Sequence, residues 1–337
     1  MVRRRSITVS DVARFAGVAS GTVSKALSGQ GQLKKETRER VIAAARELGY
    51  QPNHLAKSLL TGRSYVVGVL TTDSIGRFTI PLLTGAEDVL GAGQMSMMLC
   101  ESRNDLVRER YYLQTLLSRR VDGIIVTGRS SDERPSIGRD LPIPVVYALS
   151  RSVDPDDISI LHDDRSGAAD AVRHLVQTGR RTIAIASGPP RHSASENRRA
   201  GAEEELLRSG LAQVELPMGC AWSEEWGREV AHHISRIEPA VDGVFCMNDQ
   251  IARGVSDGLR ELGIRVPEDV GIIGMDNWDV MVESSRPPLT SIDLELPKLG
   301  RLAATLLLSL IQGEEVEPGV RLVPSSLVMR RSTGAAF

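Results

Sequence analysis

The chain has 337 residues, of which 41% are hydrophobic and 25% are charged, and its formal net charge is −2. This length predicts two or three domains. No apolar run reaches the roughly 18 residues of a membrane span. The basic start, Met1–Arg5, is followed by a charged helical pattern and not by an apolar segment, so we do not expect it to be a signal peptide. The three scattered cysteines, Cys100, Cys220 and Cys246, predict reduced thiols and neither a disulfide framework nor a metal site.

The charge is unevenly distributed along the chain. Residues 1–63 contain 12 Lys and Arg against 4 Asp and Glu, a net charge of +8, so residues 64–337 carry −10. A basic module before an acidic body predicts that the first module contacts a polyanion and that the body has another role.

The first sixty residues have the pattern of a compact helical unit. A helix is predicted to begin at Asp11 with Ser10 as its cap. Its buried face is expected to consist of Val12, Ala13, Phe15 and Ala16. Gly17 supplies a residue that turns sharply with positive φ. Further helices over 20–27 and 35–48 complete a helix-turn-helix, a motif whose second helix lies in the major groove of DNA.

Short polar side chains and one lysine face outward from the second helix. Together with Thr8, they are the candidate DNA contacts of this unit: Ser20, Gly21, Thr22, Lys25 and Ser28. The alternative is a small helical subdomain with a solvated basic face, because charge runs often mean no more than that.

The order of the motifs is more specific than any one of them. It runs Thr8-x-x-Asp11-Val12-Ala13, Gly17-Val18, Thr22-Val23-Ser24, Glu36-Thr37-Arg38, Leu48-Gly49-Tyr50-x-Pro52-Asn53 and Ala56-x-Ser58-Leu59. In this order the chain resembles the LacI/GalR family of bacterial transcriptional regulators, and the resemblance continues to about residue 332. It implies a homodimer that binds a palindromic double-stranded operator.

The chain departs from the family pattern at the positions that contact DNA. Ala19 stands where Ser is frequent, Lys25 where Arg is commoner, and Lys34 where a capping Ser is usual. Ser20 and Gly21 are too short for bidentate contacts to bases. The operator sequence therefore does not follow from the resemblance, although the operator's symmetry does.

A short segment, Asn53 to Leu60, follows the helix-turn-helix and is too short to be a stable helix alone. In the family the equivalent segments of two subunits fold on binding and enter the minor groove, where a leucine opens the central base step. The resemblance assigns this leucine to Leu59 and DNA contacts to Asn53, His54, Ala56 and Lys57. The alternative for Leu59 is an ordinary apolar linker residue.

From Tyr65 onward, short apolar runs alternate with amphipathic stretches. This alternation predicts parallel sheets covered by helices on both faces, with ligands bound at the carboxyl ends of the strands. The predicted fold class is an N-terminal all-α headpiece plus an α/β two-lobed body that resembles type I periplasmic sugar-binding proteins. The expected divisions are a headpiece over 1–51, a hinge and linker over 52–63, an N-lobe over 64–161 and 293–323, and a C-lobe over 162–292 and 324–337.

Six residues in predicted loops after strands are candidates for binding a small effector: Asp73, Phe78, Arg198, Trp222, Asn248 and Asp276. The resemblance implies that the Arg, Asn and Asp hydrogen-bond hydroxyl groups of the effector and that Trp222 packs against a sugar ring. The alternatives are that Trp222 belongs to the core and that Asp249 only caps a helix. Leu149 replaces an Asp of many relatives, while Arg103 and Thr127 are weaker candidates.

The sequence therefore predicts a dimeric, sugar-responsive repressor in the cytoplasm, at the bacterial nucleoid, without a cofactor. A metal site is not expected, because His162-Asp163-Asp164 has the pattern of a strand end with a helix cap. The adjacent His232 and His233 lie on different sides of a helix. A transport-type sugar-binding protein and a sugar-processing enzyme are the alternative functions, but no nucleophile–base pair, phosphate loop or dinucleotide motif supports an enzyme.

Overall fold

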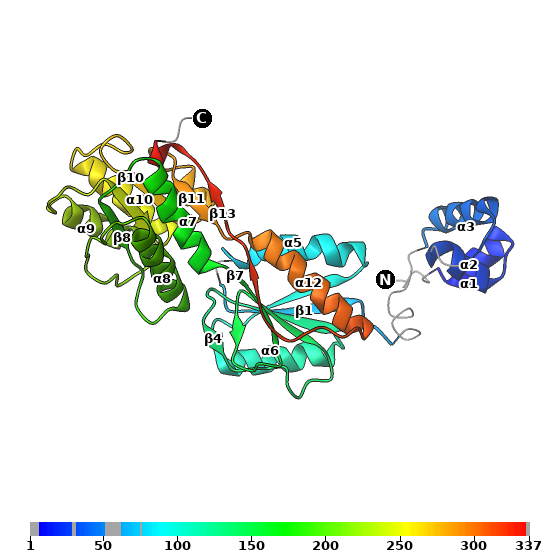
Figure 1. Cartoon of the computed structure of the whole chain (residues 1–337). Coiled ribbons are helices and arrows are strands. Elements are labelled where there is room, and N and C mark those ends of the chain that lie inside the picture. The colour runs from blue at the N-terminus through cyan, green and yellow to red at the C-terminus, as the bar shows by residue number, and fades with distance from the viewer. Residues whose placement is uncertain (1–6, 29–31, 51–61, 75, 335–337) are drawn as a thin grey trace, which may run out of the picture. The chain divides into compact units, whose positions relative to one another are not determined.

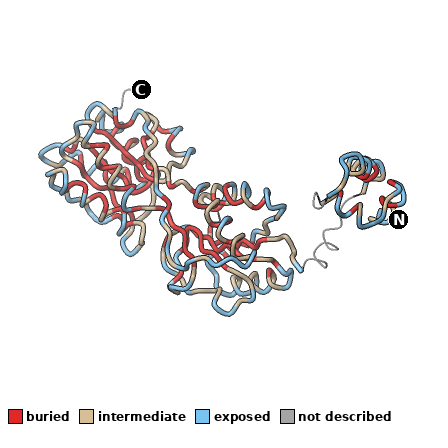
Figure 2. The backbone as a smooth tube through the Cα atoms, turned by 45° about the vertical axis from the view of Figure 1, so that its right-hand side comes forward, coloured by how far each residue is buried: buried red, intermediate tan, exposed pale blue. Residues whose placement is uncertain are grey.

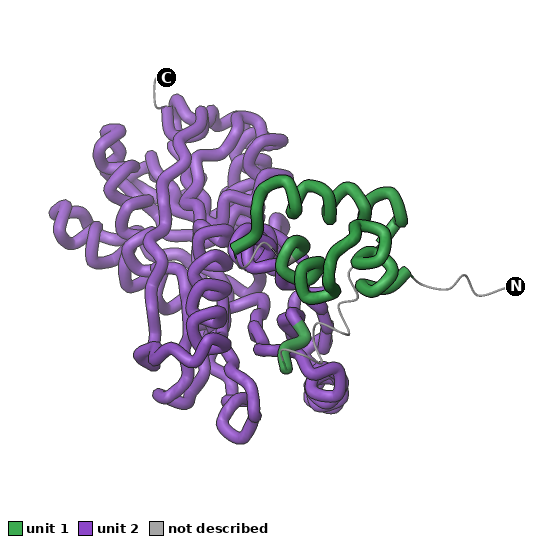
Figure 3. Tube along the Cα trace, turned by 90° about the vertical axis from the view of Figure 1, so that its right-hand side faces the viewer, with its two compact units in different colours: residues 1–64 green, residues 65–337 purple. Residues whose placement is uncertain are grey.

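The computed structural model describes residues 7–28, 32–50, 62–74 and 76–334. The chain divides into two compact units, residues 1–64 and residues 65–337, which Figure 3 colours separately. None of the helices within the described residues is long and apolar enough to cross a membrane.

The first unit consists of α1 (Val9–Ala16), α2 (Ser20–Ser28) and α3 (Lys35–Glu47). Its core is made of small apolar side chains, which let the three helices approach closely: Val12, Ala13, Ala16, Val23, Ala26, Val41, Ala44 and Ala45. Gly17 ends α1 with φ of 66°, the left-handed conformation expected there.

Two details of the first helix were predicted wrongly. The cap is Thr8 and not Ser10, because the side chains of Thr8 and Asp11 form a reciprocal capping box and the helix therefore begins at Val9. Phe15 is 53% exposed and does not belong to the core, because the neighbouring small residues already fill the space between the helices. Lys34 occupies the N-cap position of α3, and its side chain makes no capping hydrogen bond, as expected for a lysine.

The second unit contains two large sheets, one in each lobe (Figure 1). The N-lobe sheet has the order β12-β7-β5-β3-β1-β2, and all its paired strands are parallel. Its strands are β1 (Val66–Thr71), β2 (Ser96–Glu101), β3 (Gly123–Thr127), β5 (Val145–Ala148), β7 (Ile158–His162) and β12 (Gly319–Val323). Helices α5 (Thr79–Ala92) and α12 (Leu296–Gln312) cover one face, and α6 (Leu106–Ser118) covers the other.

The C-lobe sheet has the order β13-β11-β10-β9-β8, with only β13 antiparallel to its neighbour. Its strands are β8 (Ile183–Ala186), β9 (Gly243–Cys246), β10 (Gly271–Asp276), β11 (Thr290–Asp293) and β13 (Ser326–Val328). Its faces are covered by α7 (Asp164–Gln177) with α8 (Ser193–Arg208), and by α9 (Glu224–Ile234) with α10 (Asp249–Glu261). Short elements complete the unit: β4 (Glu133–Arg134), β6 (Arg151–Ser152), α11 (Asp279–Val282) and the 3₁₀ turn η1 (Arg331–Thr333).

The chain passes between the two sheets three times: after β7, after β11 and after β12. The central strands consist almost entirely of buried residues (Figure 2), because helices cover both faces of each sheet, and this explains their nearly continuous apolar sequences. Helices α5 and α12 cross at two glycines. A Cβ atom on Gly85 would lie 1.9 Å from the carbonyl oxygen of Pro297, and one on Gly300 would lie 1.9 Å from that of Leu82.

Candidate functional site

Helix α2 presents a polar surface opposite its buried side. Val23 and Ala26 pack into the core, whereas Ser20, Gly21 and Lys25 are exposed and Thr22 is half-buried. The side chains of Ser20 and Lys25 therefore lie on the side of α2 that faces away from the core. The side chain of Ser28 lies outside the described residues, as do the hinge candidates Asn53, His54, Ala56, Lys57 and Leu59.

Thr8 precedes α1, and its hydroxyl caps this helix. The hydroxyl donates to Asp11 Oδ2 at 2.7 Å, and its oxygen accepts from the Asp11 backbone N–H at 3.3 Å. Thr8 is exposed, so a contact from it to a phosphate is sterically open in addition to its role as a cap.

In the second unit, Arg198 and Asp276 lie together between the lobes. Arg198 projects from α8, and Asp276 ends β10. The guanidinium Nη1 of Arg198 lies 3.2 Å from Asp276 Oδ1 and donates to the carbonyl oxygen of Met247. Both side chains are about 95% buried, so the pair is held away from bulk solvent. These two sequence candidates are therefore brought together.

Asp164 forms a buried cluster with Arg198 and Asp276. The sequence pattern indicates only a helix cap at this position. Arg198 Nε donates to Asp164 Oδ1 at 2.5 Å, and His162 Nε2 lies 2.9 Å from the same oxygen. Burial alone would raise the pKa of Asp164, but the charge of Arg198, together with the contact from His162, outweighs it and holds this pKa at about 2. The helix cap itself is the neighbouring Asp163, which accepts from the Ser166 backbone N–H at 2.9 Å.

Arg77 reaches the cluster from the N-lobe, and the sequence analysis missed it. It forms an ion pair with Asp276 Oδ2 and donates to Gln250 Oε1 at 3.1 Å. Its guanidinium carbon lies 4.7 Å from the ring centroid of Phe78 and 4.3 Å from that of Trp278. The available signal was a cationic residue next to the candidate Phe78, in the loop after the first strand of the body.

Two further candidates use their polar atoms to hold helices. Asp73 accepts from the backbone N–H groups of Gly76, Phe78 and Thr79 at 3.2, 2.9 and 2.9 Å, and so fixes the start of α5. Asn248 Oδ1 accepts from the Ile251 backbone N–H at 2.8 Å and caps α10. Asp73 therefore has a structural role in this conformation, whereas the amide nitrogen of Asn248 makes no hydrogen bond with the described residues.

Asp249 is not the cap of α10 but joins the start of this helix to the loop after β10 and to strand β11. It accepts from the Trp278 backbone N–H at 2.7 Å and from Ser291 Oγ at 2.6 Å. Burial, together with the nearby charge of Asp276, raises the pKa of the Asp249 carboxyl well above its usual value of 3.8. The carboxyl group therefore retains its proton at higher pH than an exposed aspartic acid.

Trp222 lies against the backbone close to Arg198. A Cβ atom on Gly188 would come within 2.3 Å of the indole ring, so the ring rests directly on this glycine. The guanidinium carbon of Arg198 is 5.9 Å from the ring centroid. Trp222 is only half-buried, and one part of the ring packs on the core clusters of the C-lobe. Trp222 therefore packs against the core and also lies beside Arg198.

The remaining weaker candidates do not join the cluster. Arg103 is 66% exposed and lies 3.6 Å from Glu101. Thr127 is buried at the end of β3, and its hydroxyl has no hydrogen-bond partner among the described residues. Leu149 is fully buried with φ of 54° and offers no polar group where many relatives have an Asp.

A second contact joins the lobes near the start of α8. Asp132, in the loop after β3, accepts from the Ser193 backbone N–H at 2.8 Å, and its other oxygen lies 3.1 Å from His192 Nδ1. Burial would raise the pKa of Asp132, but the hydrogen bonds from Ser193, Ser130 and His192 outweigh it and lower this pKa. The helix that contains Arg198 is thus held by an N-lobe carboxylate.

The comparisons with known proteins agree with this architecture. Residues 8–53 match the family of bacterial regulatory proteins, lacI family, and residues 172–333 match the periplasmic binding protein-like domain. The ribose operon repressor of Halalkalibacterium halodurans is 30% identical over 97% of this chain and 97% of its own. The chain belongs to the LacI family of bacterial regulatory proteins.

Other LacI-family proteins match along nearly the whole length. The transcriptional regulator CelR of Thermobifida fusca is 33% identical over 99% of this chain and 100% of its own. The structure of the lac repressor dimer bound to operator and the anti-inducer ONPF is 27% identical, with a TM-score of 0.75 over 98% of this chain and 100% of that chain. The predicted family, fold class and regulatory function are confirmed. As a LacI-family member the chain is a DNA-binding transcriptional regulator and not an enzyme.

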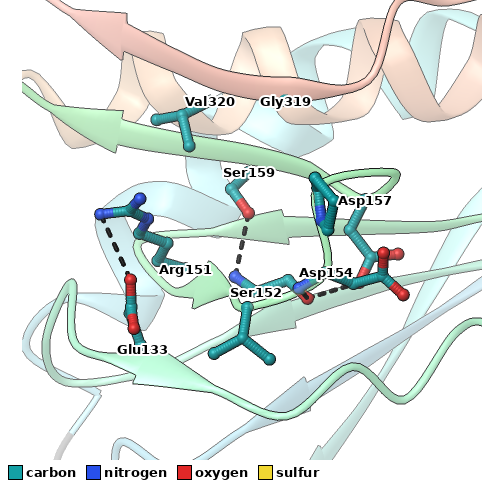
Figure 4. A pocket seen from close by; sticks show the side chains of 10 residues that line it. Glu133, Arg151, Ser152, Asp154, Asp157, Ser159, Gly319 and Val320 are labelled. Atoms are coloured by element: carbon teal, nitrogen blue, oxygen red, sulfur yellow. Dashed lines mark hydrogen bonds and ion pairs between the residues drawn. The ribbon is translucent and has the colours of Figure 1, made fainter.

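This LacI-family body also has a cavity of about 260 Å³ away from the cluster, at one edge of the N-lobe sheet (Figure 4). Its walls come mainly from β6, the loop between β6 and β7, and the start of β12. Its polar groups bind one another: Arg151 lies 3.4 Å from Glu133, and the Ser152 backbone N–H donates to Ser159 Oγ at 3.0 Å. None of the sequence candidates lines this cavity.

Proposed function

We propose that this LacI-family regulator is a homodimeric repressor whose affinity for a palindromic operator is controlled by a saccharide bound between the lobes. The main support for an effector site here is the buried pair of Arg198 and Asp276, whose Nη1 and Oδ1 atoms lie 3.2 Å apart at the carboxyl end of β10. Guanidinium N–H groups and carboxylate oxygens next to each other offer the donors and acceptors that two adjacent hydroxyl groups require.

Three further observations support a saccharide as the effector. The indole of Trp222 lies 5.9 Å from the guanidinium carbon of Arg198 and offers an aromatic surface. The amide nitrogen of Asn248 is an additional donor at the end of β9. A structural neighbour, described as the transcriptional regulator CelR–cellobiose complex, is 28% identical with a TM-score of 0.66 over 97% of this chain and 99% of that chain.

The exposed face of α2 is the proposed operator-reading surface. Residues 1–63 carry a net charge of +8, which favours a polyanion. Because Ser20 and Gly21 are short, Lys25 is the exposed side chain of this face that reaches furthest toward a base edge. The lac repressor structure contains a dimer bound to operator. It supports the proposal that two such faces, one from each subunit, bind one palindromic operator. This assignment puts the protein in the cytoplasm, at the nucleoid.

The domain divisions of the sequence analysis accompany this proposal. The headpiece over 1–51 would bind the major groove, and the hinge over 52–63 would order on the operator, with Leu59 at the central base step. The N-lobe over 64–161 and 293–323 and the C-lobe over 162–292 and 324–337 would close on the effector.

A thermal-shift screen of monosaccharides and disaccharides against the full chain tests the effector class. A saccharide that raises the melting temperature would then be measured by calorimetry against Arg198→Ala and Asp276→Ala, with Arg103→Ala as the control. We expect both cluster variants to lose binding and to retain operator affinity without saccharide, while the control remains unchanged. Equal saccharide affinity in all three variants would show that the effector binds elsewhere.

A further inference from the structure

We propose that Arg77 is a built-in competitor for the effector's place on Asp276, and that it thereby sets effector affinity. The inference rests on the proposed effector site. Arg77 lies in the loop that precedes α5 of the N-lobe, whereas Asp276 ends β10 of the C-lobe. Their side chains are 12% and 5% exposed, so the ion pair between them is largely removed from solvent. We call the contacts of Arg77 with Asp276 and Gln250 the interlobe bridge.

Both oxygens of Asp276 are occupied by guanidinium groups. Arg198 faces Oδ1 at 3.2 Å, and Arg77 pairs with Oδ2. The two arginines differ in what else holds them. Arg198 is anchored inside the C-lobe by Asp164 and by the carbonyl oxygen of Met247. Arg77 comes from the opposite lobe, so an opening of the cleft releases it while Arg198 stays in place.

The surroundings of the Arg77 guanidinium are those that a sugar ring requires. The group is planar and lies 4.7 Å and 4.3 Å from the ring centroids of Phe78 and Trp278. It also donates to Gln250 Oε1 at 3.1 Å. A pyranose that replaced it would place apolar C–H groups near the two rings and hydroxyl groups on Asp276 and Gln250. The ligand class that fits is a saccharide with at least two adjacent hydroxyl groups.

Competition of this kind lowers the apparent affinity. The effector binds only the fraction of molecules in which the interlobe bridge is broken, so its apparent Kd is the intrinsic Kd divided by that fraction. Removing the Arg77 guanidinium makes every molecule competent. A direct ligand-binding residue would have the opposite effect, because its removal weakens binding.

The test compares Arg77→Met, Arg77→Lys and the control Arg103→Met by calorimetry on the full chain with the saccharide found in the screen. Methionine retains the apolar stem without a donor, and Arg103 is an exposed arginine of the same lobe outside the cluster. We expect about 5- to 20-fold tighter binding for Arg77→Met, because a largely buried ion pair and two ring contacts no longer compete with the saccharide. Arg77→Lys should lie in between, and the control should match the natural chain. Unchanged or weaker binding by Arg77→Met overturns the proposal.

A second measurement requires no ligand and separates this proposal from the effector assignment. Amide hydrogen exchange of residues 76–80 and 277–281 should become faster in free Arg77→Met than in the natural chain and in Arg103→Met, because the interlobe bridge is lost. Faster exchange without saccharide binding by any variant would refute the saccharide effector and support the interlobe bridge. Unchanged exchange refutes the bridge, even where saccharide binds normally.

Discussion

Arg198 and Asp164 form a buried ion pair that joins the crossover between the lobes to the proposed effector site. The Nε–Oδ1 distance is 2.5 Å, and both side chains are at most 5% exposed. Asp164 is the first residue of α7, two positions after β7 ends at His162. Any movement of this crossover is therefore transmitted directly to the side chain that we propose to bind the effector.

Asp164→Asn should destabilise the fold and weaken saccharide binding. Breaking a buried ion pair costs about 3–5 kcal/mol when no partner remains. Arg198 would lose Asp164 but retain Asp276. We therefore expect the free energy of unfolding in urea to fall by about 1–3 kcal/mol. The matched control is Asp163→Asn, which retains a helix cap and does not contact Arg198. Equal losses for the two variants would show that the cap, and not the ion pair, matters.

The same pair predicts how stability changes in acid. Because the pKa of Asp164 is lowered from 3.8 to about 2, its contribution is fully present above pH 3.8 and is lost as the pH falls toward 2. Urea unfolding of the natural chain should therefore show a decline over this range that is smaller in Asp164→Asn. An equal decline of the unfolding free energy in both proteins would contradict the assignment of this acid dependence to Asp164.

Asp249→Asn should have the opposite pH dependence. The folded protein holds the Asp249 proton more tightly than the unfolded chain, so this group costs stability as the pH rises above 3.8. Asparagine resembles the protonated acid and can retain contacts with the Trp278 backbone and Ser291. The variant should therefore gain stability relative to the natural chain as the pH rises from 4 to 8. The exposed Asp279 supplies the control, Asp279→Asn, which should show no such trend.

The general fold could be predicted because its signals are local. The alternation of apolar runs with amphipathic stretches indicates parallel sheets, and Gly17 marks the turn of the helix-turn-helix. The first cap was misassigned because Ser10 and Thr8 are both good caps. Only the carboxylate of Asp11, which bonds back to Thr8, decides between them.

The cluster could be predicted only in part, because its contacts are distant in sequence. Arg198 and Asp276 follow from the family resemblance. Their partners do not: Arg77 lies 199 positions from Asp276, and Asp164 lies 34 positions from Arg198. No periodicity or spacing marks such pairs. The role of Asp73 stays a prediction, because a carboxylate in a loop before a helix serves equally well as a ligand contact or as a cap.

Gly85→Ala should destabilise the body, whereas Gly91→Ala in the same helix should not. A Cβ atom on Gly85 would lie 1.9 Å from the Pro297 carbonyl oxygen, so α5 and α12 would have to separate, at a cost of about 1–3 kcal/mol or more. Gly91 is exposed, and its nearest obstacle is the flexible end of Glu87. Alanine there should be neutral or stabilise by up to about 1 kcal/mol. Thermal unfolding of the two variants checks the difference, and similar melting temperatures would contradict it.

Lys25→Ala should weaken operator binding, and comparison with random DNA shows how. If Lys25 contacts a base edge, the loss should be about 1–3 kcal/mol on the operator, with relaxed preference at one symmetric base pair and little change on random DNA. If it contacts only phosphate, the losses should be equal and the salt dependence shallower by about one unit.

Arg14→Ala is the matched control, because it removes one positive charge from the same unit, on α1, where Arg14 pairs with Asp11 at 2.9 Å. The operator would first be selected from random palindromes, and binding measured at several salt concentrations. An equal loss for Arg14→Ala and Lys25→Ala would mean that charge alone matters and that α2 does not read sequence through Lys25.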